Sequence, residues 1–302
     1  MNTNYTEWLS GENYGNRAIL EKGIIGTLHQ PFILQNIRFS VGRQCAESIQ
    51  LGKDNLFSSI DRSIIGVLAQ GKCMSANQLF AYLMARSEYI SQKALYKRLC
   101  SLHECGLIEY LNICEKKNEN DSENGENEEE SGEWLRMYQL SDLTYSLCPL
   151  MNIPADSPDN RNLIYKMNRG IFRYIIKSAL ANGIVLNFLT YYDKVLGFCI
   201  EKLYNMMLGE PLEIPLYIET EREKYMFFLS NNLTIQSDLA CCLRYYEETH
   251  QKVRFVFVVS TVQEMSTLKE EVLAMADNGL KIGLSVISNW FGEKKGDIIL
   301  LN

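Results

Sequence analysis

Three amphipathic helical segments follow one another between residues 57 and 106, and each has a start or stop signal. In the second segment Ser75 stands three residues before Gln78, which is the spacing of a capping box. In the third, Ser91 stands at the equivalent position, and Gly106 follows the last apolar turn as a helix stop. Apolar side chains recur at helical spacing throughout. These signals predict helices over 57–71, 74–87 and 90–106.

Two segments rich in aromatic and branched side chains follow, and they predict the strands of a hairpin. They are LIEYLNICEKK, residues 107–117, and EWLRMYQLSD, residues 133–142. Residues 118–133 between them contain eight acids and no basic or large apolar residue. Such a segment cannot bury enough surface to offset the entropy lost on ordering, so we expect a loop there.

This order of three helices and a hairpin, with the junction HECGLIEYL, resembles the winged-helix pattern. The resemblance covers roughly residues 57–145 and implies that the third helix, 91–105, reads duplex DNA from the major groove. The chain departs from the pattern at the wing tip, where such proteins present Arg or Lys to the phosphates. The acidic loop 118–133 would be repelled by DNA, or would screen the site until a partner arrives.

The third helix has a polar face opposite its core stripe, and this face carries the candidate contacts. Gln92 suits a bidentate contact with adenine, while Lys93 and Lys97 suit guanine or phosphate. Eight basic and five acidic residues give residues 58–117 a net charge of +3, inside a chain of −7. The candidate DNA-binding residues are Gln92, Lys93, Tyr96, Lys97, Arg98, Ser101, Lys116, Lys117 and Arg136. The alternatives are an ordinary solvated face, or a winged helix that binds protein rather than DNA.

The C-terminal half predicts a mixed α/β domain. Apolar periodicity predicts helices over 162–183, 191–207, 233–250 and 261–279. Predicted strands cover 184–190, 212–218, 224–230, 252–261, 281–288 and 297–302. The element order resembles the restriction-endonuclease-like core. A winged helix followed by such a domain resembles the replication-relaxation proteins of plasmids and conjugative elements.

These segments divide the chain into four parts. Residues 1–56 are read as an N-terminal arm and 57–147 as the winged-helix domain. Residues 148–162 contain three prolines and are read as a linker, followed by the α/β domain over 163–302. We therefore predict an α+β or α/β protein in which a winged helix precedes a degenerate nuclease-like core.

The resemblance to nucleases implies a metal site that the residues do not supply. Such enzymes hold Mg²⁺ with an acid on one central strand and an acid-x-Lys triplet on the next. Two places before Lys224 stands Arg222, and the strand KYMFFLS has no carboxylate. Glu293 and Lys295 have the triplet spacing, but in a glycine-flanked loop. We therefore expect no catalytic residues and no metal.

No nucleotide or cofactor motif accompanies these elements, so no cofactor is expected. We predict a non-enzymatic, cytoplasmic DNA-binding protein that regulates replication, mobilisation or transcription. No apolar run is long enough to cross a bilayer, so no membrane partner is expected. The expected partner is double-stranded DNA. The C-terminal domain would in addition bind a protein partner or a second copy of the chain. The enzymatic alternative is a divergent Mg²⁺-dependent nuclease that uses Glu213, Glu219 or Glu221.

Overall fold

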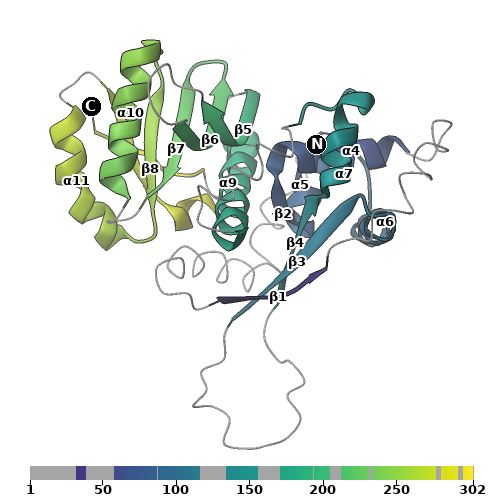
Figure 1. Ribbon diagram of the computed structural model, residues 1–302. Coiled ribbons are helices and arrows are strands. Elements are labelled where there is room, and N and C mark those ends of the chain that lie inside the picture. The colour runs from purple at the N-terminus through teal and green to yellow at the C-terminus, as the bar shows by residue number, and fades with distance from the viewer. Residues whose placement is uncertain are drawn as a thin grey trace, which may run out of the picture. The chain divides into compact units, whose positions relative to one another are not determined.

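The computed structural model describes most of residues 58–301 and one earlier strand (Figure 1). The chain folds into two compact units. The first unit comprises Glu12–Ala69 and Cys73–Pro158, and the second comprises Asp159–Asn302 with two short earlier stretches. The described residues are 32–38, 58–86, 88–115, 134–155, 171–192, 194–204, 212–230, 234–276, 280–291 and 295–301.

The first unit contains the three predicted helices. They are α4 (Ser59–Gly71), α5 (Ala76–Ala85) and α6 (Gln92–Glu104). Each buries one apolar stripe, as the periodicity predicted. On α6 this stripe consists of Leu95, Leu99 and Leu102, all nearly or fully buried.

Both predicted N-caps are confirmed. The Ser75 hydroxyl accepts a hydrogen bond from the Gln78 N–H at 3.2 Å, and Gln78 Oε1 accepts one from the Ser75 N–H at 3.2 Å. The Ser91 hydroxyl accepts from the Ala94 N–H at 3.2 Å. These contacts satisfy N–H groups that the first turn of a helix otherwise leaves unpaired, so they fix where α5 and α6 begin.

Gly106 ends α6 and leads directly into the hairpin. Its φ of 72° lies in the left-handed region that glycine adopts without a steric penalty. The N–H groups of Gly106 and Leu107 bond back to the carbonyls of His103 and Leu102, which is the Schellman arrangement. Strand β3 (Ile108–Glu115) then pairs antiparallel with β4 (Trp134–Leu140), confirming the predicted hairpin.

Two further strands complete a four-stranded sheet in the order β1-β3-β4-β2. Strand β1 (Phe32–Arg38) pairs with β3, and β2 (Cys73–Ser75) pairs with β4, both antiparallel. Neither pairing was predicted, and β2 is too short to give a period-2 signal. After β4, Ser141 caps α7 (Asp142–Leu147), which runs into the short 3₁₀ helix η3 (Cys148–Met151).

The second unit is built on a six-stranded mixed sheet in the order β10-β9-β8-β7-β6-β5. The first three strands, β5, β6 and β7, form an antiparallel meander, and β7, β8 and β9 are parallel. The short β10 pairs antiparallel with β9. The strand bounds are β5 Val195–Tyr204, β6 Leu212–Thr220, β7 Lys224–Leu229, β8 Arg254–Val259, β9 Lys281–Val286 and β10 Ile299–Leu300.

Helices cover both faces of this sheet (Figure 1). Side chains of α10 (Ile235–Thr249) and α11 (Val262–Ala276) share one core with Met226 and Phe228 of β7. The intervening Phe227 points to the opposite face, where it meets Phe188 of α9 (Ile171–Tyr191) at 5.6 Å between ring centroids. Strands covered on both faces carry the near-continuous apolar runs that β7 and β8 show.

Two element predictions in this unit are wrong. Residues 184–190 were expected as a strand, but they form the last turns of α9. Residues 191–207 were expected as a helix, but Val195–Tyr204 form strand β5. The remaining predicted strands from β6 to β10, and the helices α10 and α11, lie where the sequence placed them.

Candidate nucleic-acid interface

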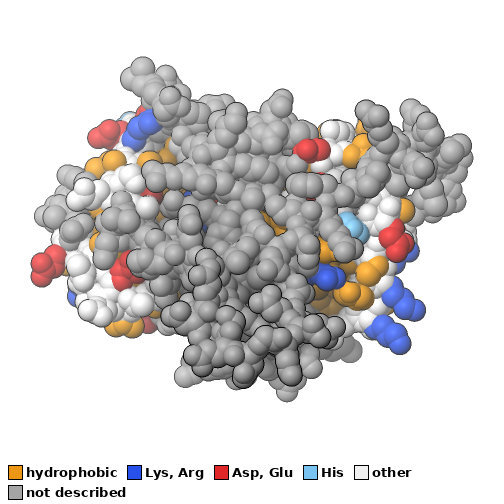
Figure 2. Space-filling model, turned by 60° about the horizontal axis from the view of Figure 1, so that its bottom comes forward, with side chains coloured by type: hydrophobic (Ala, Val, Ile, Leu, Met, Phe, Trp, Pro, Cys, Tyr) orange, Lys and Arg blue, Asp and Glu red, His pale blue; other side chains and the backbone are white. Residues whose placement is uncertain are grey.

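The exposed face of α6 brings together four of the predicted contacts. Gln92, Lys93, Tyr96 and Lys97 are all exposed, at the i, i+1, i+4, i+5 spacing of one side of a helix. We call these four residues the α6 face. Neither lysine has a carboxylate partner among the described residues. Figure 2 shows several Lys and Arg side chains in blue on the right of the view, the side on which Figure 1 places α6. The face therefore offers two uncompensated ammonium groups to an anionic ligand.

Arg136 extends this face onto the hairpin. Its Nη1 donates a hydrogen bond to the Tyr96 hydroxyl at 3.3 Å, and its guanidinium carbon lies 4.5 Å from the centroid of the Tyr110 ring. Burial alone would lower the pKa of Arg136. Charge interactions and a hydrogen bond with Tyr138, and charge interactions with Tyr96 and Tyr110, outweigh burial and raise that pKa. The hairpin thus adds a third cation, which is linked to the α6 face through Tyr96.

The Tyr110 ring beneath Arg136 is itself held in place by packing. The Tyr110 ring lies against His103 at 4.6 Å, and the His103 imidazole Nδ1 lies 3.0 Å from the Ile108 carbonyl oxygen. Burial raises the pKa of Tyr138 to about 12, so its phenol is neutral at physiological pH. A guanidinium stacked on an aromatic ring loses little further entropy when it binds a phosphate.

Arg98 has a structural partner. Its Nε donates to Asp61 Oδ1 at 2.8 Å, and its Nη2 bonds Asp61 Oδ2. The same carboxylate accepts from the N–H and the hydroxyl of Ser58 at 2.9 and 2.8 Å. Since the Asp61 side chain is fully buried, Arg98 compensates a buried charge rather than lying free beside the α6 face.

The other candidate residues are placed less completely. Ser101 is half-buried, one turn beyond Lys97. Lys116, Lys117 and the acidic loop 118–133 lie outside the described residues. Arg136 and the α6 face are therefore the predicted contacts that the described residues bring together.

Each acid of the nuclease alternative pairs with a different lysine. Glu213 pairs with Lys177 at 3.0 Å, Glu219 with Lys224 at 3.5 Å, and Glu221 with Lys194 at 3.5 Å. Within the part of the chain that the structure describes, no three His, Cys, Asp or Glu side chains come close enough to share a metal ion. Nor does any described helix combine the length and the apolar character that a membrane span requires.

Sequence reasoning missed Tyr110 as a partner of Arg136 and Asp61 as the partner of Arg98. Strand pairing could have suggested the first, because Tyr110 lies opposite Tyr138, two residues from Arg136 on the same strand. Nothing in the sequence links Asp61 with Arg98, which is 37 positions further along the chain.

Comparisons with known proteins identify no relative of this chain. No match was found among protein-family models, curated proteins or solved structures. The significance of the α6 face therefore rests on the residues of this chain and their geometry.

Proposed function

We propose that the protein binds duplex DNA, with the α6 face in the major groove and Arg136 at the phosphate backbone. The observation that carries this proposal is the exposure of two unpaired lysines on a helix, beside a tyrosine-held arginine on the following hairpin. One α-helix fits the major groove, and side chains near its N-terminus reach the base edges. Gln92 and Lys93 occupy the first turn of α6.

The element order of the first unit supports a winged-helix arrangement. From α4 onward it reads helix, strand, helix, helix, strand, strand, with β2 paired to β4. This order places a short strand between the first two helices and the hairpin directly after the third. A regulator of replication, mobilisation or transcription is the biological class that this proposal favours.

A fluorescence-anisotropy titration against random-sequence duplex DNA tests the proposal. Affinity is expected to fall steeply between about 50 and 200 mM salt, because phosphate contacts release counterions. The double substitution Lys93→Glu, Lys97→Glu should weaken binding about a hundredfold at the lower salt concentration. The matched control, Lys252→Glu with Lys269→Glu, changes the net charge equally at exposed lysines of the second unit.

The control separates a local contact from the effect of total charge. If both double variants lose affinity equally, the α6 face is not the binding surface. If the wild-type chain binds no duplex at either salt concentration, the proposal is wrong and the protein-interaction alternative is favoured.

A further inference from the structure

A cavity of about 500 Å³ lies in the second unit, between the starts of β7 and β8 and the segment 295–300. Its volume falls in the range of about 300–1,000 Å³ that small-molecule sites occupy. The charged residues that line it are Glu223, Arg254, Lys295 and Asp297. The wall also contains Tyr192 and Tyr225, with Ile298 and Leu300. The cavity therefore combines charges of both signs with an apolar wall.

The segment that carries Lys295 and Asp297 is held firmly in place. The Gly296 N–H donates to Asn187 Oδ1 at 2.9 Å, and the Gly296 carbonyl accepts from the Tyr192 hydroxyl at 2.7 Å. The Asp297 carbonyl accepts from the Ser285 hydroxyl at 2.5 Å. These bonds fix the backbone between Lys295 and Asp297 and at the Asp297 carbonyl, and such preorganisation lowers the entropy cost of binding a ligand.

On this segment the charged groups are available to a ligand. Lys295 Nζ lies 4.1 Å from the centroid of the Tyr192 ring, and its contact within the described chain is with this ring. The Asp297 carboxylate has no hydrogen-bond or ion-pair partner among the described residues. An ammonium over a ring face keeps N–H donors for a second partner. A donor and an acceptor thus stand two residues apart on the same wall.

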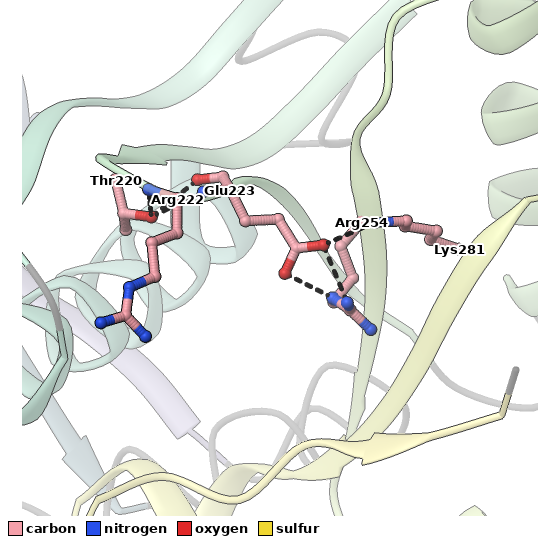
Figure 3. A network of polar contacts seen from close by, with 5 residues as sticks. All are labelled: Thr220, Arg222, Glu223, Arg254 and Lys281. Atoms are coloured by element: carbon pink, nitrogen blue, oxygen red, sulfur yellow. Dashed lines mark hydrogen bonds and ion pairs between the residues drawn. The ribbon is translucent and has the colours of Figure 1, made fainter.

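Across the cavity, Glu223 orients Arg254 (Figure 3). Arg254 donates to Glu223 from Nε at 2.9 Å and from Nη2 at 2.8 Å, and Lys281 lies 3.3 Å from the same carboxylate. The side chain of Arg254 is only 13% exposed, so it keeps one orientation. Its Nη1 makes no hydrogen bond within the described chain, which leaves one fixed guanidinium donor for a ligand.

We propose that this cavity binds a free α-amino acid with an apolar side chain. Lys295 and Arg254 would hold its carboxylate, and Asp297 would accept hydrogen bonds from its ammonium group. Tyr225, Ile298 and Leu300 supply an apolar surface for the side chain.

The Asp297 carboxylate favours this ligand over a phosphate. Two cations and two anions line the cavity, and Lys281 adds a third cation 3.3 Å from the Glu223 carboxylate, so Glu223 is already paired. A phosphate dianion would meet the Asp297 carboxylate without a cation to offset it, whereas a zwitterion meets a partner of opposite sign at each end. The inference does not depend on DNA binding, because the proposed DNA contacts lie in the first unit and the cavity lies in the second.

Thermal unfolding of the full chain with each of the twenty standard L-amino acids tests the proposal. At least one apolar or aromatic amino acid should raise the unfolding midpoint, because a ligand that binds only the native state stabilises it. Its N-acetyl derivative, which lacks the ammonium charge, and its amide, which lacks the carboxylate, should each bind at least about tenfold more weakly by calorimetry. Inorganic phosphate and AMP serve as the phosphate probes.

Site variants then locate the binding. Lys295→Gln and Asp297→Asn should each weaken the amino acid's affinity about tenfold or more. Lys269→Gln, an exposed position on α11, should leave it unchanged. Circular dichroism checks that the exposed-site variants are folded. The proposal is overturned if no amino acid shifts the midpoint, if the variants bind like wild type, or if the phosphate probes bind in place of amino acids.

Discussion

Arg98 of α6 donates two hydrogen bonds to the fully buried carboxylate of Asp61 on α4. The pair connects the helix that carries the proposed DNA contacts to α4, the first helix among the described residues. It also separates two roles that the sequence had combined, because Arg98 belongs to the framework while Lys93 and Lys97 face outward.

Truncating this arginine should destabilise the first unit. Arg98→Ala leaves the Asp61 charge buried without a cation, which should cost about 3 kcal/mol, the low end for a broken buried pair because Arg98 is 38% exposed. Urea unfolding measures the loss. Lys97→Ala, one position earlier and exposed, should change the unfolding free energy by less than about 0.5 kcal/mol. Equal stability of the two variants would show that the pair contributes nothing.

Removing single lysines from the α6 face should change the salt dependence of DNA binding. If Lys93 and Lys97 each neutralise one phosphate, Lys93→Ala and Lys97→Ala should each reduce the slope of log K against log salt by about 0.9. Anisotropy titrations over a series of salt concentrations give this slope. An unchanged slope in both variants would place the phosphate contacts elsewhere.

Ser91 allows stability and DNA affinity to be separated. Ser91→Ala removes the cap on the Ala94 N–H and should cost about 1 kcal/mol. Ser91→Asp keeps a capping oxygen, so stability should be near wild type, but its negative charge at the groove-facing end of α6 should weaken DNA binding. Wild-type DNA affinity in Ser91→Asp would contradict the proposed docking.

Glu223 should contribute a pH-dependent part of the second unit's stability. Burial alone raises its pKa, but hydrogen bonds and charges from Arg254 and Lys281 outweigh burial and lower that pKa below 4.5. The stabilisation is therefore present above pH 4.5 and is lost as pH falls through the lowered pKa. Denaturant unfolding of wild type and Glu223→Gln should differ at neutral pH and converge in acid. A difference that stays constant through the acid range would rule out this linkage.

Gly296 should not tolerate a side chain. A Cβ there would lie 2.3 Å from a ring carbon of Trp290, which is fully buried. Gly296→Ala should therefore destabilise the second unit by about 1–3 kcal/mol. Gly66→Ala on α4 is the control, because nothing lies within 4 Å of its added Cβ and alanine favours a helix interior by up to about 1 kcal/mol. Thermal midpoints that move in the same direction would contradict this account.

Local signals predicted most of the elements, and two long-range effects explain the errors. The last turns of α9 are buried on all sides at Ile184, Val185 and Phe188, so their apolar run carries no helical period. Strand β5 has a register shift between Val195 and Gly197 and a left-handed φ at Glu201. Both interrupt the alternation by which an edge strand is recognised.

The two candidate sites differ in how completely the sequence alone predicts which residues form them. The α6 face lies on one helix, so spacing alone placed Gln92, Lys93, Tyr96 and Lys97 together. The cavity of the second unit joins residues from 192 to 300, through a sheet order that no local pattern encodes. The sequence singled out Lys295 only through its triplet spacing from Glu293. In the structure its ammonium group lies over the Tyr192 ring.

The junction at Gly106 and Leu107 serves both ends of the first unit's hairpin. Leu107 donates to Leu102 in α6, while its carbonyl accepts from the Ser141 N–H at 3.1 Å and from the Thr144 hydroxyl at 2.6 Å. These hydrogen bonds fix the position of α6 relative to both strands of the hairpin. One residue inserted after Leu107 would turn β3 over and point Tyr110 away from Arg136. Exchanging side chains would therefore leave the geometry of this surface intact, whereas lengthening the connection would not.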